Sequence, residues 1–444
     1  MRFLKSNPRL AVLLLILVVV GILRYRKEAV TVNPVDEISV GWSGVVVVDR
    51  DIDAARFPWP AWRGPQGHGV APDQPLPTEW SDTTGVLWRA DVPGRGHSSP
   101  VVIGNTVCLA TALSEPEEQQ VAAWDRSNGQ LQWTTIVHTG GLPSGRELHG
   151  KSTHANGTIA CDGRHLYTAF LNSDSIVVTA LTLSGDIVWQ QEAGKFVSRF
   201  GYAASPIIYK SLVIVAADNS GGSYLAALDG ETGAVAWRTE RENVDSYSSP
   251  TVATVGGRDQ LLISGGDNVI SYDPATGKQL WVSPHNPEAT CGTIVTTDDL
   301  VFASGGYPSN ETVCLNGDGK RMWADKTRLY EPSLVVLGDN LIGVTDRGIA
   351  HCWNTTTGEL VWRERLSGNF SASPLVCNGR IYVSNLSGDT FVFTSQNGAY
   401  QQVSQNKLGN DCYASPAAVD GKLFLRIGLG TGSEREEQLV CIGE

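Results

Sequence analysis

The chain lacks most of the short motifs that assign a protein to a catalytic class. It contains no G-x-S-x-G, H-E-x-x-H, P-loop or EF-hand sequence, so it offers no familiar hydrolase, metalloprotease, nucleotide or calcium site. It has no C-x-x-C-H segment, which excludes a c-type haem attached through that motif. Beyond the N-terminus no stretch has the 3.6-residue apolar period of a helix, and a helical fold is therefore excluded.

Basic residues are scarce in most of the chain. The formal net charge is −12, and all six charged residues before Glu28 are basic, so the remainder carries −18. A body this acidic repels phosphate backbones, and it has no basic stripe, so we expect no nucleic-acid binding. The eight histidines follow no standard metal-ligand spacing, and we expect no metal site.

Long apolar runs are also missing, apart from one near the N-terminus. That run covers 14 residues, from Leu10 to Leu23, whereas a membrane-spanning helix needs ~20. Basic residues precede it, and RYRKE follows in place of an A-x-A-like cleavage site. We expect residues 1–27 to be an uncleaved signal-anchor helix, with a cleaved signal peptide as the alternative. Both place the protein in the cell envelope, either anchored in the inner membrane and facing the periplasm or released into the periplasm.

Eight cysteines invite a disulfide interpretation, but most occupy positions that recur in a repeat. Cys314, Cys352 and Cys441 stand where other copies of the repeat have small apolar residues, which is typical of buried core thiols. Equivalent positions of different repeats are rarely within bridging distance. Cys108, Cys291 and Cys412 remain as disulfide candidates.

The repeat itself is the strongest signal in the sequence. LDGETGAVAW (228–237), YDPATGKQLW (272–281) and WNTTTGELVW (353–362) place an Asp or Asn, a Thr-Gly and a Trp at the same offsets. Between these segments a Ser-Pro recurs, followed by two apolar runs separated by a turn, and eight such units can be counted. Four strands in ~40–45 residues is the period of a β-propeller blade, and the sequence predicts an all-β, eight-bladed propeller over residues 80–444.

The recurring tryptophans have a structural explanation. The Asp or Asn opens a turn, the Gly adopts a positive φ, and a wide ring on the outer strand can cover the next blade. The predicted docking residues are Trp88, Trp133, Trp189, Trp237, Trp281, Trp323 and Trp362.

The last unit ends before its own turn and tryptophan. The strand that it lacks is available in TTGVLWRADV (83–92), so we expect this N-terminal strand to complete the eighth blade. In the seventh unit Gln402 stands near the tryptophan position, and the junction after this unit should be the weakest. Residues 28–79 are expected to form an extended linker laid over the propeller.

The pattern A-x-D-x-x-T-G-x-x-x-W, from Ala227 to Trp237, resembles the tryptophan-docking repeat of the PQQ-like propeller superfamily. This superfamily contains eight-bladed quinoprotein alcohol dehydrogenases and the propeller lipoprotein of the outer-membrane β-barrel assembly machinery. The resemblance implies, for the dehydrogenases, PQQ with a calcium ion and commonly a disulfide between adjacent cysteines. Because this chain has no adjacent cysteines, we expect no cofactor, with PQQ and calcium as the alternative.

The residues just before each innermost strand should surround one mouth of the channel. Aromatic residues and arginine are enriched at binding hot spots. The candidate binding residues are His97, His154, Arg199, Tyr202, Tyr247, Glu331, Phe370 and Tyr413. None has a partner that marks it as a general base, and we predict no catalytic residue.

Together these features predict a monomeric, exported propeller, tethered to the membrane, that binds or scaffolds envelope or membrane proteins without catalysis. The first alternative is a PQQ- and calcium-dependent dehydrogenase of an alcohol or sugar. The second is an envelope sensor of a small ligand or polysaccharide.

Overall fold

A computed structural model describes residues 44–50 and 52–444. The predicted signal-anchor (1–27) lies outside the described residues. Among the residues that are described, no helix is both long enough and apolar enough to cross a membrane. Apart from two short 3₁₀ turns, η1 (Gly145–Glu147) and η2 (Gly432–Glu434), the described secondary structure consists of 32 strands.

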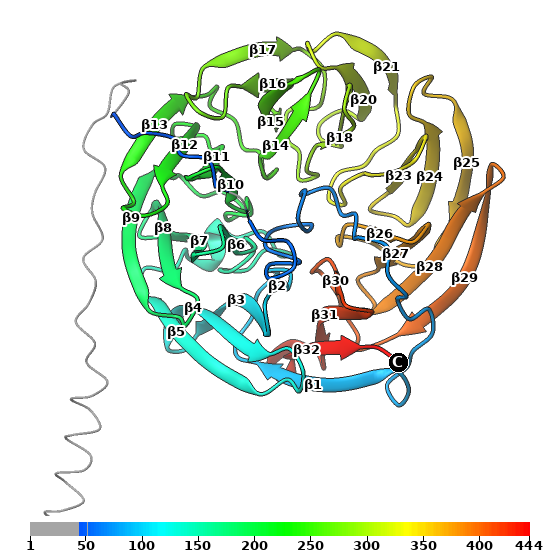
Figure 1. Ribbon diagram of the computed structural model, residues 1–444, viewed down its shortest axis with the longest axis horizontal. Coiled ribbons are helices and arrows are strands. Elements are labelled where there is room, and N and C mark those ends of the chain that lie inside the picture. The colour runs from blue at the N-terminus through cyan, green and yellow to red at the C-terminus, as the bar shows by residue number, and fades with distance from the viewer. Residues whose placement is uncertain (1–43, 51) are drawn as a thin grey trace, which may run out of the picture.

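The strands form eight antiparallel sheets of four strands each, arranged as blades in a ring (Figure 1). Blade 1 contains β2 (Val101–Ile103), β3 (Thr106–Ser114), β4 (Glu117–Asp125) and β5 (Leu131–Thr139). Blade 2 contains β6 (Ala160–Cys161), β7 (His165–Asn172), β8 (Ser175–Thr182) and β9 (Ile187–Lys195). Blade 3 contains β10 (Ile207–Tyr209), β11 (Leu212–Ala217), β12 (Tyr224–Asp229) and β13 (Val235–Glu240). Blade 4 contains β14 (Thr251–Val255), β15 (Arg258–Gly265), β16 (Asn268–Tyr272) and β17 (Gln279–Ser283).

The second half of the ring repeats this arrangement. Blade 5 contains β18 (Val295–Thr296), β19 (Leu300–Gly305), β20 (Glu311–Asn316) and β21 (Arg321–Asp325). Blade 6 contains β22 (Val335–Leu337), β23 (Asn340–Val344), β24 (Ile349–Asn354) and β25 (Leu360–Arg365). Blade 7 contains β26 (Leu375–Cys377), β27 (Arg380–Ser384), β28 (Asp389–Gln396) and β29 (Ala399–Lys407). Blade 8 contains β30 (Ala417–Val419), β31 (Lys422–Leu429), β32 (Glu436–Ile442) and the N-terminal strand β1 (Val86–Val92). The predicted eight-bladed propeller with four-stranded blades is confirmed.

The middle strands of each blade are apolar on both faces because a neighbouring blade covers each face. Strand β11 (LVIVAA) is buried at every position, and β12 at all but its last. Continuous apolar runs of this kind are expected wherever both faces of a sheet are covered. The outermost strands are half-exposed, as in the alternating pattern of β5.

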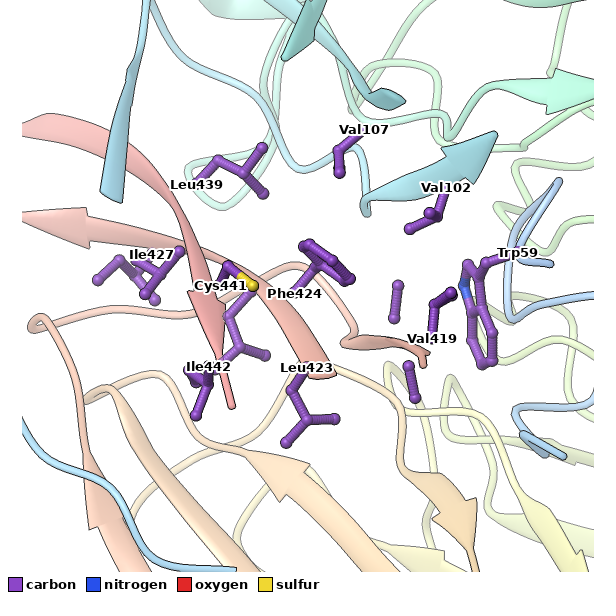
Figure 2. Close-up of a cluster of buried hydrophobic side chains, with 14 of the residues drawn as sticks. Trp59, Val102, Val107, Val419, Leu423, Phe424, Ile427, Leu439, Cys441 and Ile442 are labelled. Atoms are coloured by element: carbon purple, nitrogen blue, oxygen red, sulfur yellow. The ribbon is translucent and has the colours of Figure 1, made fainter. Parts of the chain in front are cut away.

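The N-terminal strand closes the ring, as the sequence predicted. Strand β1 pairs antiparallel with β32, and Trp88 lies opposite Cys441. The apolar cluster at this closure joins blades 7, 8 and 1 and includes Phe424 and Leu439 (Figure 2). Trp59, from the segment before the propeller, belongs to the same cluster and is 1% exposed.

A ring of hydroxyl groups links the blades around the channel. In seven of the eight junctions a backbone N–H just before an innermost strand donates to a Ser or Thr hydroxyl of the next blade. The N–H donors with their hydroxyl acceptors, each 2.9 Å apart, are Ser99 to Thr158, Thr158 to Ser205, Ser205 to Ser249, Thr293 to Ser333, Ser333 to Ser373, Ser373 to Ser415 and Ser415 to Ser99. At the remaining junction the Thr293 hydroxyl accepts from the indole N–H of Trp62 at 3.0 Å. This ring explains why the Ser-Pro segment recurs in the sequence.

Six of the seven repeat tryptophans cover the turn glycine of the following blade. A β-carbon at Gly277 would lie 2.5 Å from Cε3 of Trp237, and the same close approach recurs in five other blades. The Trp237 indole also donates to the Pro274 carbonyl at 3.2 Å. The glycine–tryptophan pairs are Gly129–Trp88, Gly185–Trp133, Gly233–Trp189, Gly277–Trp237, Gly319–Trp281 and Gly358–Trp323. The seventh, Trp362, contacts Tyr400 and donates to the Ser395 hydroxyl at 2.9 Å.

The junction between blades 7 and 8 is built differently. Val392 pairs with Ser404 as Ala227 pairs with Trp237, so Ser404, and not Gln402, occupies the tryptophan position. The two-residue offset arises because the hairpin of blade 7 is longer: Val392 and Ser404 are 12 positions apart, whereas Ala227 and Trp237 are 10 apart. Trp80, from the segment before β1, lies buried in the cluster that spans this junction, and its backbone N–H donates to Asn406 at 2.9 Å.

All eight cysteines are free thiols, and seven of them are buried. Cys108 and Cys412, which were disulfide candidates, pack in the interior, and Cys291 is half-buried. Several of these thiols replace small side chains in the packed blades, as the repeat positions predicted.

Candidate functional site

The segment that precedes the propeller closes one end of the central channel. It runs along the face that carries the turns between the first and second strands of the blades: Asp73 accepts from the Asn378 N–H, and Gln74 from the Gly421 N–H. In Figure 1 this dark blue segment crosses the centre of the ring. At its middle Trp62 reaches Thr293 on the channel wall, and this indole forms the floor of a cavity.

The cavity has a volume of about 490 Å³ and is bordered, opposite Trp62, by the loops that enter the innermost strands. All eight blades contribute to it. Its lining combines aromatic rings, hydroxyl groups and charged side chains, and the principal members are Trp62, His97, Lys151, Thr158, Arg199, Phe200, Ser205, Asp245, Tyr247, Ser249, Glu288, Thr293, Tyr307, Arg328, Tyr330, Glu331 and Tyr413.

The structure brings five of the eight candidate binding residues to this cavity. They are His97, Arg199, Tyr247, Glu331 and Tyr413.

The other three candidates lie elsewhere, although each precedes an innermost strand. Tyr202 is 7% exposed and packs against Phe196 with ring centroids 5.6 Å apart. Phe370 is fully buried against Phe391, and His154 borders a small separate gap beside blade 2. The loops before the strands differ in length and path, so the same sequence offset points some side chains to the axis and others between blades.

Aromatic rings form the walls of the cavity. His97 and Tyr413 stack face to face across the junction of blades 1 and 8, with centroids 4.1 Å apart. Phe200 meets Tyr247 edge to face at 6.3 Å, and the Arg199 guanidinium lies 5.0 Å from the Phe200 centroid. These contacts fix large flat surfaces around an open space.

Two ion pairs involve most of the charged side chains around the mouth. Lys151, in the long loop between blades 1 and 2, contacts Glu331 of blade 6 at 2.6 Å and so spans the mouth. Ser371 donates a hydrogen bond to the other oxygen of the same carboxylate. Arg199 contacts Asp245 at 3.5 Å. Sequence reasoning missed Lys151 and Trp62, because neither lies at a repeat position.

Burial favours the neutral forms of His97, Tyr247 and Cys291 in the cavity walls. Burial, with the nearby positive charges of Arg95 and two other arginines, lowers the pKa of His97 well below its ordinary value. Its Nε2 is buried and has no hydrogen-bond partner among the residues that the structure describes. Burial raises the pKa of the Tyr247 hydroxyl and of the Cys291 thiol, so neither is a ready nucleophile at neutral pH.

The residues of the cavity do not fit PQQ with calcium. Among the described residues, no group of three or more His, Cys, Asp or Glu side chains is placed to hold a metal ion. PQQ carries three carboxylates, whereas two of the three cationic side chains in the lining, Lys151 and Arg199, are already paired with acids. We therefore derive no chemical step through this cofactor.

The blade count, the repeat and the axial cavity define an eight-bladed propeller of the PQQ-like superfamily. The family model of the outer membrane protein assembly factor BamB matches residues 70–146, 117–349 and 309–409, and the chain belongs to this family.

Individual relatives are distant. The chain is 23% identical to outer membrane protein assembly factor BamB of Burkholderia pseudomallei (strain K96243) over 345 residues, which are 69% of this chain and 87% of that protein. Among solved structures, BamB from Moraxella catarrhalis matches with a TM-score of 0.58 at 16% identity, covering 81% of this chain and 97% of that one. Quinohemoprotein alcohol dehydrogenase from Comamonas testosteroni matches with a TM-score of 0.63 at 13% identity, covering 88% and 82%. The two structural matches bear on the fold alone.

Proposed function

We propose that this chain is a membrane-tethered propeller of the cell envelope that binds proteins and performs no catalysis. Its partners are proteins that assemble the outer membrane. Membership of the BamB family supports this assignment, since the name of the family states a role in outer-membrane protein assembly.

The observation that carries the non-catalytic part is the pairing of two of the three acids in the cavity. Glu331 is held by Lys151 and Ser371, and Asp245 by Arg199. A general base needs a carboxylate or imidazole that is available to a substrate proton. The third acid, Glu288, lies exposed at the rim and forms no ion pair among the described residues.

The position of the first described residues bears on how a tethered propeller would be oriented. The backbone N–H of Val48 donates to Ser211 and Asp49 contacts Lys210, both at the turn between the first two strands of blade 3. That turn is on the face closed by Trp62. A chain anchored through its N-terminus would therefore present the cavity and its loops away from the membrane, toward soluble domains of a partner.

The test is a binding measurement between the purified full chain and the periplasmic domains of the protein that assembles outer-membrane β-barrels in the same organism. We expect saturable binding by biolayer interferometry, weakened in a variant whose rim charges are reversed, Arg199→Glu with Asp245→Arg. A variant reversed on the opposite face, Lys210→Glu, serves as the matched control. Absence of binding at ~10 μM would contradict the proposal, because specific envelope complexes of standard size are tighter than this.

A titration with PQQ, with and without calcium, examines the enzymatic alternative directly. We expect no change in absorbance or thermal unfolding. Calcium-dependent stabilisation by PQQ would overturn the non-catalytic assignment and leave the measured protein binding to be explained separately.

A further inference from the structure

The closed end of the cavity carries four hydroxyl groups whose protons have no acceptor among the described residues. The hydroxyls of Thr158, Ser205 and Ser249 each accept a backbone N–H, and that of Thr293 accepts the Trp62 indole. In the described part of the chain none of the four hydroxyls donates its own proton to a protein acceptor. All four residues are buried, with exposures between 1% and 6%, and all four line the cavity.

The protons of these four hydroxyls are the polar groups that remain free for a ligand. The Tyr247 hydroxyl and the His97 Nε2 also have no partner in the described structure, but both atoms are sealed within the wall and do not face the open space. Leaving a buried polar group unpaired is costly, so such groups are normally satisfied by water or a ligand. Together the four hydroxyls form a donor-rich surface at the closed end of the cavity.

The charge of the lining selects against ionic ligands. Three basic and three acidic side chains line the cavity, so their formal charges cancel. Two of these pairs are in direct contact, and no cluster of one sign remains to hold a phosphate, a carboxylate or a metal ion. The ligand that fits is neutral.

An extended peptide fits poorly. Peptides that add to a sheet require a free strand edge with unpaired N–H and C=O groups. Around the channel, the N–H groups that precede the innermost strands already donate to the hydroxyl ring, as at Ser99 and Thr158. Trp62 also closes the floor, so a chain cannot thread through.

We propose that this cavity binds a neutral sugar, as a free disaccharide or as the end of a glycan. A pyranose ring has flat C–H faces that stack on aromatic rings, and hydroxyl groups that accept and donate hydrogen bonds around its edge. The cavity supplies both complements: aromatic surfaces from Trp62, Phe200 and Tyr413, and the hydroxyls at its base that still have a proton to donate. Its volume of about 490 Å³ is within the ~300–1,000 Å³ typical of small-ligand sites. This binding is independent of the proposed protein scaffold role.

The experiment uses the full chain in a detergent without a sugar headgroup, titrated by calorimetry and by saturation-transfer NMR. The probes are maltose and N,N′-diacetylchitobiose, and the six-sugar oligomer of each distinguishes a free disaccharide from a glycan end. We expect saturable binding of at least one probe. A preference for the disaccharide assigns a free sugar, and equal affinity for disaccharide and oligomer assigns binding of a chain end.

Two variants connect binding to the cavity. Phe200→Ala removes a ring that is 38% exposed, and we expect about tenfold weaker binding, which corresponds to ~1.4 kcal/mol. Tyr413→Ala removes a second ring of the lining, which is half-exposed, and should weaken binding by a similar factor. Tyr209→Ala, on the opposite face, should bind as the wild type does.

The proposal is overturned if no probe binds at about 50 mM while the protein remains folded, because even a weak sugar site saturates there. It is equally overturned if Phe200→Ala and Tyr413→Ala bind the sugar unchanged. If no sugar probe binds and an unstructured peptide binds saturably in the same cavity, the site is assigned to a protein ligand instead.

Discussion

Replacing Trp237 by alanine should measure how strongly the repeat tryptophans hold neighbouring blades together. The Trp237 side chain is 3% exposed, and its ring lies over Gly277 of blade 4. Its indole N–H donates to the Pro274 carbonyl at 3.2 Å. Truncation of a buried tryptophan costs ~3–5 kcal/mol, and this range includes the cavity that it leaves.

The corresponding shift in melting temperature follows from the size of the protein. Unfolding entropy is about 2.1 cal/mol/K per residue near 60 °C, or ~0.8 kcal/mol/K for roughly 400 residues. A loss of about 4 kcal/mol therefore lowers Tm by roughly 5 °C. Differential scanning calorimetry and urea unfolding, monitored by tryptophan fluorescence and circular dichroism, both provide the measurement.

Two further variants separate the parts of this contact, and a third serves as a control. Trp237→Phe keeps most of the apolar surface and loses the hydrogen bond, so about 1–2 kcal/mol should be lost. Gly277→Ala keeps the tryptophan but places a β-carbon 2.5 Å from its ring at a φ of +68°, so it should also destabilise. Val188→Ala, on an outer strand and 40% exposed, is the control. A loss below ~1 kcal/mol for Trp237→Ala would refute the inference that these rings hold the blades together.

The remaining predictions concern other contacts between blades. Ser205→Ala leaves the buried Thr158 N–H unpaired and should cost about 1–3 kcal/mol in urea unfolding, whereas Ser205→Thr keeps the hydroxyl and should be nearly neutral. Trp80→Ala empties the junction of blades 7 and 8 and should cost ~3–5 kcal/mol by the same measurement. Burial, aided at His68 by a nearby arginine, lowers the pKa of His68 and of His138 from 6.5 to about 4. Since the unfolded chain then binds more protons between pH 6.5 and about 4, stability should fall as pH falls through this window, and less so in the double glutamine variant.

Clear results would contradict each of these expectations. Equal destabilisation by alanine and threonine at position 205 would show that the hydroxyl does not matter. A neutral Trp80→Ala variant would mean that the seventh junction is held by other contacts. An unchanged slope of stability against pH after replacement of both histidines would show that they do not titrate with unfolding.

The propeller could be predicted from the sequence because its signals are local and repeated. Most blades have their own turn residues, apolar strands and tryptophan. Because the pattern occurs in eight copies, it can be recognised even where one copy deviates from it. The closing strand was found by the same reasoning, since the last unit lacked one strand and residues 83–92 supplied it. The prediction placed the tryptophan position of blade 7 at Gln402, whereas strand pairing places it at Ser404. The hairpin of blade 7 is two residues longer than that of blade 3, and the spacing from the turn glycine does not reveal this.

The candidate site was predicted only in part. Five of eight residues reached the cavity, because a fixed offset before a strand does not determine the direction of a side chain in a loop of variable path. Tyr202 and Phe370 show the difference: both precede an innermost strand, yet both pack between blades.

By itself, then, the sequence determined the number of blades, their strand order and the closure of the ring, since these depend on neighbouring residues and on turn chemistry. Only the tertiary structure decided what meets on the axis. Trp62 and Thr293 are separated by 231 positions and Lys151 and Glu331 by 180, and each pair is joined only when eight blades close around one centre. The hydroxyl ring and the neutral, aromatic cavity follow from that closure. The blades are arranged around a common axis, so residues at one repeat position of each blade lie next to each other and form a continuous surface.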